Sequence, residues 1–122
     1  MPDCLFCKII KGEIPSYKIY EDKEFLAFLD IFPKSAGHTL VIPKAHVQWV
    51  WDYPNLGRYF ELVGNLARHL RQVSGREVVR GLVYGVEVAH AHVHLMPNKT
   101  DEFDGKQLAA DKLLALVKRY RL

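Results

Sequence analysis

The chain has 122 residues, of which 49% are hydrophobic and 25% are charged, and its formal net charge is +3 at pH 7. This length fits one domain, residues 1–122, with a modest core that a partner subunit could enlarge. The composition excludes a disordered chain, and so mild a positive charge gives little support to nucleic-acid binding. No apolar run approaches the roughly 20 residues of a membrane helix, and no signal-peptide pattern is present. We therefore expect a cytoplasmic protein without a membrane partner.

Short elements are predicted for the first half of the sequence. Residues 6–15 have the character of a short helix, which Gly12 and Pro15 end. Three strands are predicted next, over residues 17–22, 25–33 and 37–46. Because short turns join them, these strands indicate an antiparallel meander.

A long helix and further strands are predicted for the second half. Residues 54–73 carry apolar side chains at helical spacing, with Pro54 near the start, which predicts an amphipathic helix lying across the sheet. Residues 77–97 predict two more strands, with Gly81 and Gly85 as places for a turn or bend.

A C-terminal loop and helix are expected over residues 98–122. We expect the helix to run from about residue 105 or 106 to Tyr120. Strands and helices that do not alternate regularly indicate an α+β fold. The sequence therefore predicts an antiparallel sheet of about five strands, one long helix across it and a C-terminal helix.

Three histidines alternate with apolar residues in the last predicted strand. Because successive side chains of a strand point to opposite faces, His90, His92 and His94 share one face, and the residues between them face the core. A polar face exposed to solvent is the plain interpretation. Three ligands of one catalytic metal ion are another, although positions spaced by two on one strand do not close easily around an ion.

The two cysteines, Cys4 and Cys7, have C-x-x-C spacing. In a reducing compartment this spacing favours a metal or redox role over a structural disulfide. A thioredoxin-like redox pair of cysteines is one alternative, but it lacks the expected strand before it and the helix context after it. Two free buried thiols are the remaining alternative.

Two separate segments resemble the histidine triad family of nucleotide hydrolases and transferases. One is the H-x-H-x-H motif followed by two apolar residues, and the other is residues 4–46, which are similar nearly residue for residue to the N-terminal half of the family. Together they span about the first 97 residues, in the expected order. The resemblance implies the fold of that family and a homodimer that pairs two sheets across a two-fold axis.

The resemblance implies roles for the histidines. His92 would attack the α-phosphorus of a nucleoside phosphate derivative and form a nucleotidyl-histidine that water then cleaves. Its opposite ring nitrogen must then carry a proton, usually held by a backbone carbonyl. His94 would donate hydrogen bonds to the phosphate oxygens, and His38 would fix the network. A purely structural His38 is the alternative.

The resemblance also implies a purine ribonucleotide site. Asp30 matches the carboxylate that accepts both ribose hydroxyls, although aspartate is also common in turns at strand ends. The apolar positions that match the base cleft are Leu5, Phe6, Ile9, Phe28, Ile31 and Leu40. Each of these six could equally be plain core.

A structural zinc ion is implied by the zinc-containing, bacterial-type branch of the family. There the C-x-x-C pair joins two histidines in a tetrahedral site. The matching residues here are Cys4, Cys7, His46 and His90. Two thiolates and two imidazoles with no open position are the composition of a structural zinc site, so His90 would not act as an acid or base.

The residues before the triad depart from the pattern of many family members. Where those have Gly-Gln-Ser/Thr-Val, this chain has Gly-Val-Glu-Val, so Val86 cannot donate a hydrogen bond. Glu87 could protonate a leaving group or only face solvent. We expect hydrolysis or transfer at the α-phosphate of purine ribonucleoside phosphoramidates or dinucleoside polyphosphates. The alternative is a nucleotide-binding module with little turnover that acts through protein contacts.

Overall fold

The computed structural model describes residues 3–122, and its centre is a five-stranded antiparallel sheet in the order β1-β2-β3-β5-β4. The strands are β1 (Lys18–Glu21), β2 (Phe25–Leu29), β3 (Thr39–Pro43), β4 (Val79–Leu82) and β5 (Val93–Pro97). The α-helices are α1 (Leu5–Ile10), α2 (Leu56–Ser74) and α3 (Ala110–Tyr120), and a 3₁₀ turn spans Val50–Asp52. The predicted α+β class and five-stranded sheet are confirmed. No helix in the described part of the chain has both the length and the apolar character needed to cross a bilayer.

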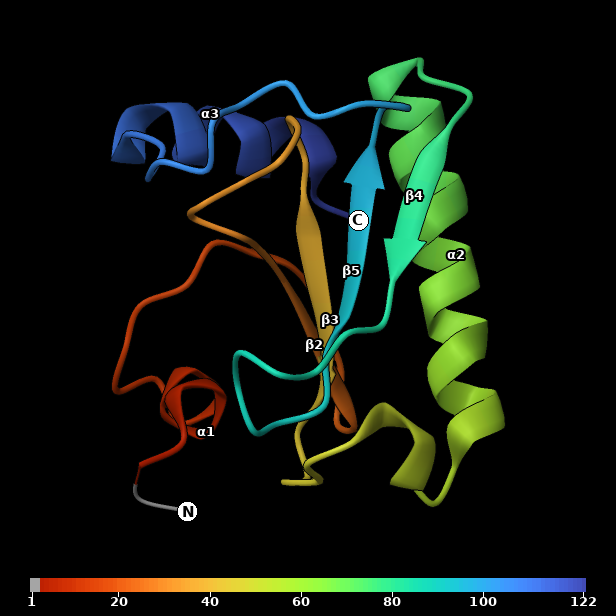
Figure 1. Cartoon of the computed structure of the whole chain (residues 1–122). Coiled ribbons are helices and arrows are strands. Elements are labelled where there is room, and N and C mark those ends of the chain that lie inside the picture. The colour runs from red at the N-terminus through yellow and green to blue at the C-terminus, as the bar shows by residue number, and fades with distance from the viewer. Residues whose placement is uncertain (1–2) are drawn as a thin grey trace.

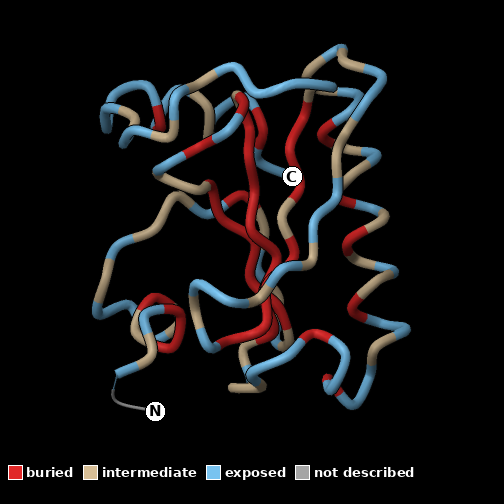
Figure 2. Tube along the Cα trace, viewed as in Figure 1, coloured by how far each residue is buried: buried red, intermediate tan, exposed pale blue. Residues whose placement is uncertain are grey.

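The two faces of the sheet have separate cores. The larger core lies between the sheet and helices α2 and α3, and the smaller one lies under α1 on the opposite face. Figure 1 shows α1 on one side of the sheet and α2 on the other, and Figure 2 shows the central strands buried between them. The small core and α1 together bound the face that carries the histidines.

The long helix α2 is amphipathic, as the apolar spacing predicts. The Asn55 side chain accepts a hydrogen bond from the Arg58 N–H at its start, and Gly75 ends it with a left-handed φ of +71°. The Tyr59 hydroxyl, fully buried, donates to the Val41 carbonyl oxygen at 2.6 Å. This bond fixes α2 across the middle of the sheet.

Only one of the three alternating histidines lies in a strand. The predicted strand over the whole motif was wrong, because β5 begins at Val93 and residues 83–92 form no strand. In this stretch Gly85 has a φ of +82°, and a Cβ there would come within 3.2 Å of the Trp49 ring. The alternation of faces nevertheless holds: Ala91 and Val93 between the histidines, and Leu95 after them, belong to the larger core.

The helix α3 begins at Ala110, later than the sequence predicts. The loop before it is held to the β2–β3 connection, because the Leu108 N–H donates to the Ile31 carbonyl at 2.8 Å. Ala109, just before the helix, has an extended backbone (φ −63°, ψ 146°), so the helical conformation begins only at Ala110. At the other end of α3, the Tyr120 ring packs on Gly37, whose φ is +86° and whose Cβ would lie 3.0 Å from the ring.

Candidate active site

A pocket of about 350 Å³ lies between α1 and the sheet. It is lined by the seven residues predicted to form the nucleotide site, by the candidate acid Glu87 and by two of the triad histidines: Leu5, Phe6, Ile9, Phe28, Asp30, Ile31, Leu40, Glu87, His92 and His94. The chain of residues 14–17, together with Leu29, Phe32 and Val88, also lines it and was missed from the sequence. Pro15 marks a turn in that stretch, but no local signal ties the turn to a pocket on a distant strand.

The hydrogen bonds of His92 fix which ring nitrogen is free. Its Nδ1 lies 2.8 Å from the His90 carbonyl oxygen, which can only accept, so Nδ1 carries the proton. The lone pair of the neutral ring is therefore on Nε2. The Phe6 ring packs edge-on against this imidazole with 5.2 Å between centroids, which restricts its rotation. In this tautomer, His92 presents Nε2 as the free nitrogen of a buried, fixed ring.

A chain of hydrogen bonds sets the tautomers of His38 and His94. The Lys34 backbone N–H donates to His38 Nδ1 at 2.9 Å, so the neutral His38 ring carries its proton on Nε2. This Nε2–H points at His94 Nδ1, 2.9 Å away, and leaves the His94 proton on Nε2. His94 lines the pocket, whereas His38 lies behind it.

Both rings of this pair are neutral at pH 7. Burial, reinforced by the positive charge of neighbouring groups, lowers the pKa of His38 to about 3. Burial and the nearby His92 lower the pKa of His94 to about 4. The donor character of His94 therefore comes from a fixed neutral tautomer rather than from a positive charge.

Asp30 follows the last residue of β2 at the edge of the pocket. Its Oδ1 accepts the Phe32 N–H at 2.9 Å, and its Oδ2 lies 3.7 Å from His38 Nε2. Burial raises the pKa of this carboxyl above its usual value. The Phe32 N–H in the turn after Asp30 holds Oδ1, so Oδ2 is the oxygen that this turn leaves free.

Glu87 lies on the pocket side, which strand parity alone would not allow. Residues 86–90 form a bend after Gly85, and Glu87, although exposed, lines the same pocket as His92 and His94. Val86 is 66% exposed and does not line the pocket. The bend therefore carries the single acidic group of the Gly-Val-Glu-Val stretch to the mouth of the site.

The four predicted zinc ligands form one cluster below the pocket. Cys4, Cys7, His46 and His90 each offer a ligand atom within 4.8 Å of the others. The two histidine Nδ1 atoms are 3.2 Å apart, and Cys7 Sγ lies 3.3 Å from His46 Nδ1 and 3.6 Å from His90 Nδ1. Tetrahedral zinc bonds separate two nitrogens by about 3.3 Å and a nitrogen from a sulfur by about 3.6 Å. The donor set and its spacing fit a zinc ion.

Further contacts support the ligand role of this cluster. The His90 Nε2–H donates to the Pro43 carbonyl at 2.7 Å, which leaves the Nδ1 lone pair facing the cysteines. The Cys7 N–H points at Cys4 Sγ, 3.3 Å away. Among the described residues, no group of potential ligands unites His90, His92 and His94. This division argues against three histidines on one catalytic ion.

Comparisons with known proteins agree on one family. The HIT domain family model matches residues 11–101 of the chain. The chain is 43% identical over 102 residues to Protein hit from Bacillus subtilis, covering 78% of this chain and 70% of that protein. It is 42% identical over 105 residues to adenosine 5'-monophosphoramidase HNT1 from Saccharomyces cerevisiae, covering 84% of this chain and 66% of that protein. A zinc-bound histidine triad family protein from Mycobacterium smegmatis has a similar structure, with a TM-score of 0.80 and 30% identity, covering 98% of this chain and 91% of that one.

Proposed function

The chain belongs to the histidine triad (HIT) family, and on that premise we propose that it is a single-domain hydrolase acting at the α-phosphate of purine ribonucleotides. Its relatives include a nucleotide phosphoramidase, which supports hydrolase activity at the level of the family. The substrates that we propose are purine ribonucleoside phosphoramidates, with dinucleoside polyphosphates as a related class. One observation carries the proposal: the His90 carbonyl holds the Nδ1 side of His92 and leaves its Nε2 free, while His94, with its Nδ1 bonded to His38, lines the same pocket.

In the first step, His92 Nε2 forms a bond to the α-phosphorus and the phosphorus–nitrogen bond of a phosphoramidate breaks. The leaving amine takes up one proton from solvent, and Glu87 is proposed to relay that proton because Glu87 lines the same pocket. The His90 carbonyl stabilises the positive charge that develops on the attacking ring, since it accepts the Nδ1–H throughout. The product of this step is a nucleotidyl-histidine and a free amine.

In the second step, water attacks the same phosphorus and His92 leaves. The nucleoside monophosphate departs with the oxygen of that water, and the remaining proton passes to solvent. The His94 Nε2–H donates to a non-bridging oxygen in both steps, because His38 holds its other nitrogen as an acceptor. His38 is therefore proposed to act through His94 and not on the substrate.

The nucleoside is proposed to occupy the apolar part of the pocket. Asp30 would accept both ribose hydroxyls, while Phe6, Phe28 and Ile31 form walls for a purine ring. Leu5, Ile9 and Leu40 complete the cleft. Apolar walls do not read the edge of a base, so this cleft is expected to select purines by size and stacking rather than to separate adenine from guanine.

The cysteine–histidine cluster is proposed to hold a structural zinc ion. With four protein ligands, a bound zinc ion would tie the start of α1 to the segment that precedes β5 and would activate no water. The cluster adjoins the nucleophile, because the ring of His90 belongs to the cluster while its carbonyl holds His92. The metal is therefore expected to stabilise the site rather than take part in the chemistry.

A homodimer is proposed through the exposed edge of the sheet. β4 is the last strand in the sheet order and pairs with one described neighbour, β5. Exposed apolar side chains follow this edge: Val78, Leu82, Tyr84 and Val86. A strand edge with exposed apolar groups is a surface that natural proteins cover, and a second copy would do so while enlarging a small core.

Turnover of adenosine 5'-phosphoramidate tests the proposed function. Wild-type protein should release ammonia and AMP, and a rapid acid-free quench should give an intact mass raised by one adenylyl group, located on His92 by peptide mapping. His92→Gly should abolish turnover while AMP affinity stays within about tenfold, because a lost nucleophile removes only transition-state interactions. Nucleotide binding without turnover by the wild type would instead support the binding-module alternative, which the exposed Val86 favours.

A further inference from the structure

The segment after β5 is bound to the turn that carries His38. The Glu102 N–H donates to the Lys34 carbonyl at 2.7 Å, and the Leu108 N–H donates to the Ile31 carbonyl at 2.8 Å. Glu102 and Leu108 lie beyond the residues that match the HIT domain family model. Residues outside the matched range 11–101 therefore brace the β2–β3 connection.

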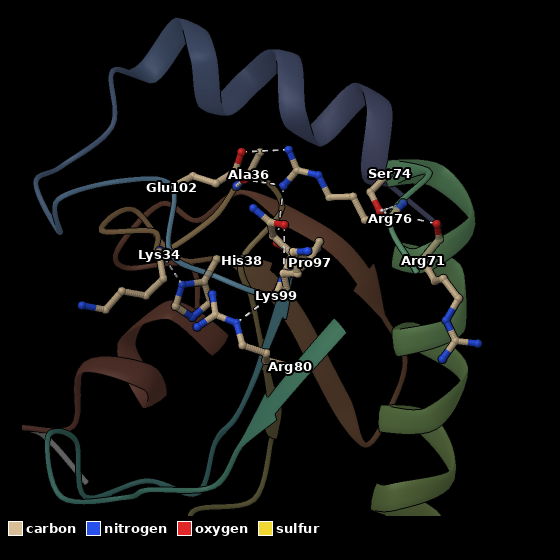
Figure 3. A network of polar contacts seen from close by, with 11 residues as sticks. Lys34, Ala36, His38, Arg71, Ser74, Arg76, Arg80, Pro97, Lys99 and Glu102 are labelled. Atoms are coloured by element: carbon tan, nitrogen blue, oxygen red, sulfur yellow. Dashed lines mark hydrogen bonds and ion pairs between the residues drawn. The ribbon is translucent and has the colours of Figure 1, made fainter. Parts of the chain in front are cut away.

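The Glu102 side chain connects this brace to Arg76, in the loop between α2 and β4 (Figure 3). Its Oε1 accepts the Ala36 backbone N–H at 3.0 Å. Its carboxylate also receives both Nη groups of Arg76, one of them at 2.8 Å on Oε2. Both side chains are partly buried, at 26% and 33% exposure, and a bidentate pair in such a setting holds its geometry better than a fully exposed pair.

The position of this turn determines the tautomers of the two histidines behind the phosphate site. Lys34 is bonded on both of its backbone groups: its carbonyl to the Glu102 N–H and its own N–H to His38 Nδ1. If the turn moves, His38 Nδ1 loses its donor and the neutral ring is free to place its proton on either nitrogen. His94 would then lose the fixed donor on its Nδ1 side, and its own proton would no longer be confined to Nε2.

We propose that Glu102, held by Arg76, is a positioning residue that fixes the neutral tautomers of His38 and His94. The effect passes from the Glu102 carboxylate through the Ala36 and Lys34 backbone to His38, and from there to the His94 Nε2–H. Its consequence for turnover rests on the proposed function, whereas its consequence for the tautomers does not. Glu102 touches neither the pocket nor the metal cluster.

Side-chain substitutions separate this role from general stabilisation. Glu102→Ala removes the acceptor for Ala36 and the partner of Arg76, while Glu102→Gln keeps an acceptor oxygen and removes the charge. Asp101→Asn is the matched control, because Asp101 is the preceding residue of the same loop and pairs with Arg80 at 2.8 Å without bonding to the turn. Arg76→Ala tests the second half of the pair.

The decisive measurement is ¹⁵N NMR of the histidine side chains, which distinguishes protonated from unprotonated ring nitrogens without substrate. In the wild type, His38 should have an unprotonated Nδ1 and a protonated Nε2 at neutral pH. Glu102→Ala should give averaged signals from both tautomers of His38 and His94, with a smaller change in Glu102→Gln and none in Asp101→Asn. If Glu102→Ala does not fold, Glu102→Gln and Arg76→Ala provide the same comparison.

Kinetics provide the second measurement. Glu102→Ala should lower kcat for adenosine 5'-phosphoramidate on the order of tenfold with little change in KM, because only the orientation of a transition-state donor is lost. The Glu102 and Arg76 substitutions should combine less than additively. Unchanged tautomers in Glu102→Ala, or an equal loss of kcat in Asp101→Asn, would overturn the proposal. An inactive wild type with the expected tautomers would reject the proposed function and leave the positioning role supported.

Discussion

Acid should destabilise the fold through the buried histidine pair before most carboxylates titrate. The perturbation is a change from pH 7 to pH 5, and the group is His38, which is 3% exposed. Its folded pKa lies below its unfolded value, so as pH falls the unfolded state binds the proton first. The contribution to stability is therefore full above the unfolded pKa and is lost progressively as pH falls from there toward the folded pKa.

The size of the effect follows from the two pKa values of His38. With an ordinary value of 6.5 and a folded value of about 3, the free energy of unfolding falls by about 2 kcal/mol between pH 7 and pH 5 for this one group. His94, with a folded value of about 4, adds a loss of similar size. Such a loss is a large fraction of the stability of a small domain.

Urea unfolding followed by circular dichroism at the two pH values measures this loss. His38→Asn is the informative variant, because an asparagine oxygen can still accept the Lys34 N–H but does not titrate. Wild type and variant share the metal cluster and every carboxylate, so these contributions cancel in the comparison at one protein concentration. The variant should lose about 2 kcal/mol less than the wild type between the two pH values.

Equal losses in the two proteins would refute the reasoning. They would mean that His38 binds its proton equally well in the folded and unfolded states, and hence that neither burial nor the hydrogen-bond chain keeps the ring neutral. His38 would then not supply a fixed Nε2–H donor to His94 Nδ1.

Three further predictions concern the ribose, the metal and the dimer. Asp30→Asn should weaken binding of ribonucleotides and hardly change binding of their deoxy counterparts in calorimetry, and equal losses for both sugars would exclude a ribose role. Protein purified without chelator should contain about one equivalent of zinc by metal analysis, and Cys4→Ser should lower Tm more than turnover. Well under half an equivalent would overturn the zinc assignment, and loss of activity on chelation without loss of fold would favour a catalytic metal. Light scattering at micromolar concentration should give twice the mass of the chain, and a monomer mass would contradict the proposed dimer.

Local patterns were sufficient for most of the fold. The apolar spacing of residues 54–73 and the buried runs of β2 and β3 report directly on which faces meet the core, so α2 and the meander could be predicted. The alternation of residues 90–95 likewise identified the core face. The start of β5 at Val93 could not be predicted, because the bend before it depends on Gly85 packing against Trp49, which is distant in the sequence.

The candidate site divides in the same way. Residue types and their resemblance to a family were enough to suggest which side chains meet at the pocket and which at the metal cluster. The proton positions could not be inferred, since they depend on the backbone groups of Lys34 and His90 that face the rings. The pairing of Arg76 with Glu102 could not be inferred either, because two charged residues in separate loops give no periodic sequence signal.

The contact between Gly37 and Tyr120 couples the position of the C-terminal helix to the turn that carries His38. The ring at the end of α3 lies against the residue before His38, in a space that a single methyl group would already overfill. The Leu122 N–H is in turn bonded to the Ile19 carbonyl of β1 at 2.9 Å. A fusion partner joined after Leu122, or a protease that trims α3, would therefore disturb the packing of Tyr120 on Gly37, the residue before His38. Kinetic constants measured on protein tagged at this end would then include the effect of the tag.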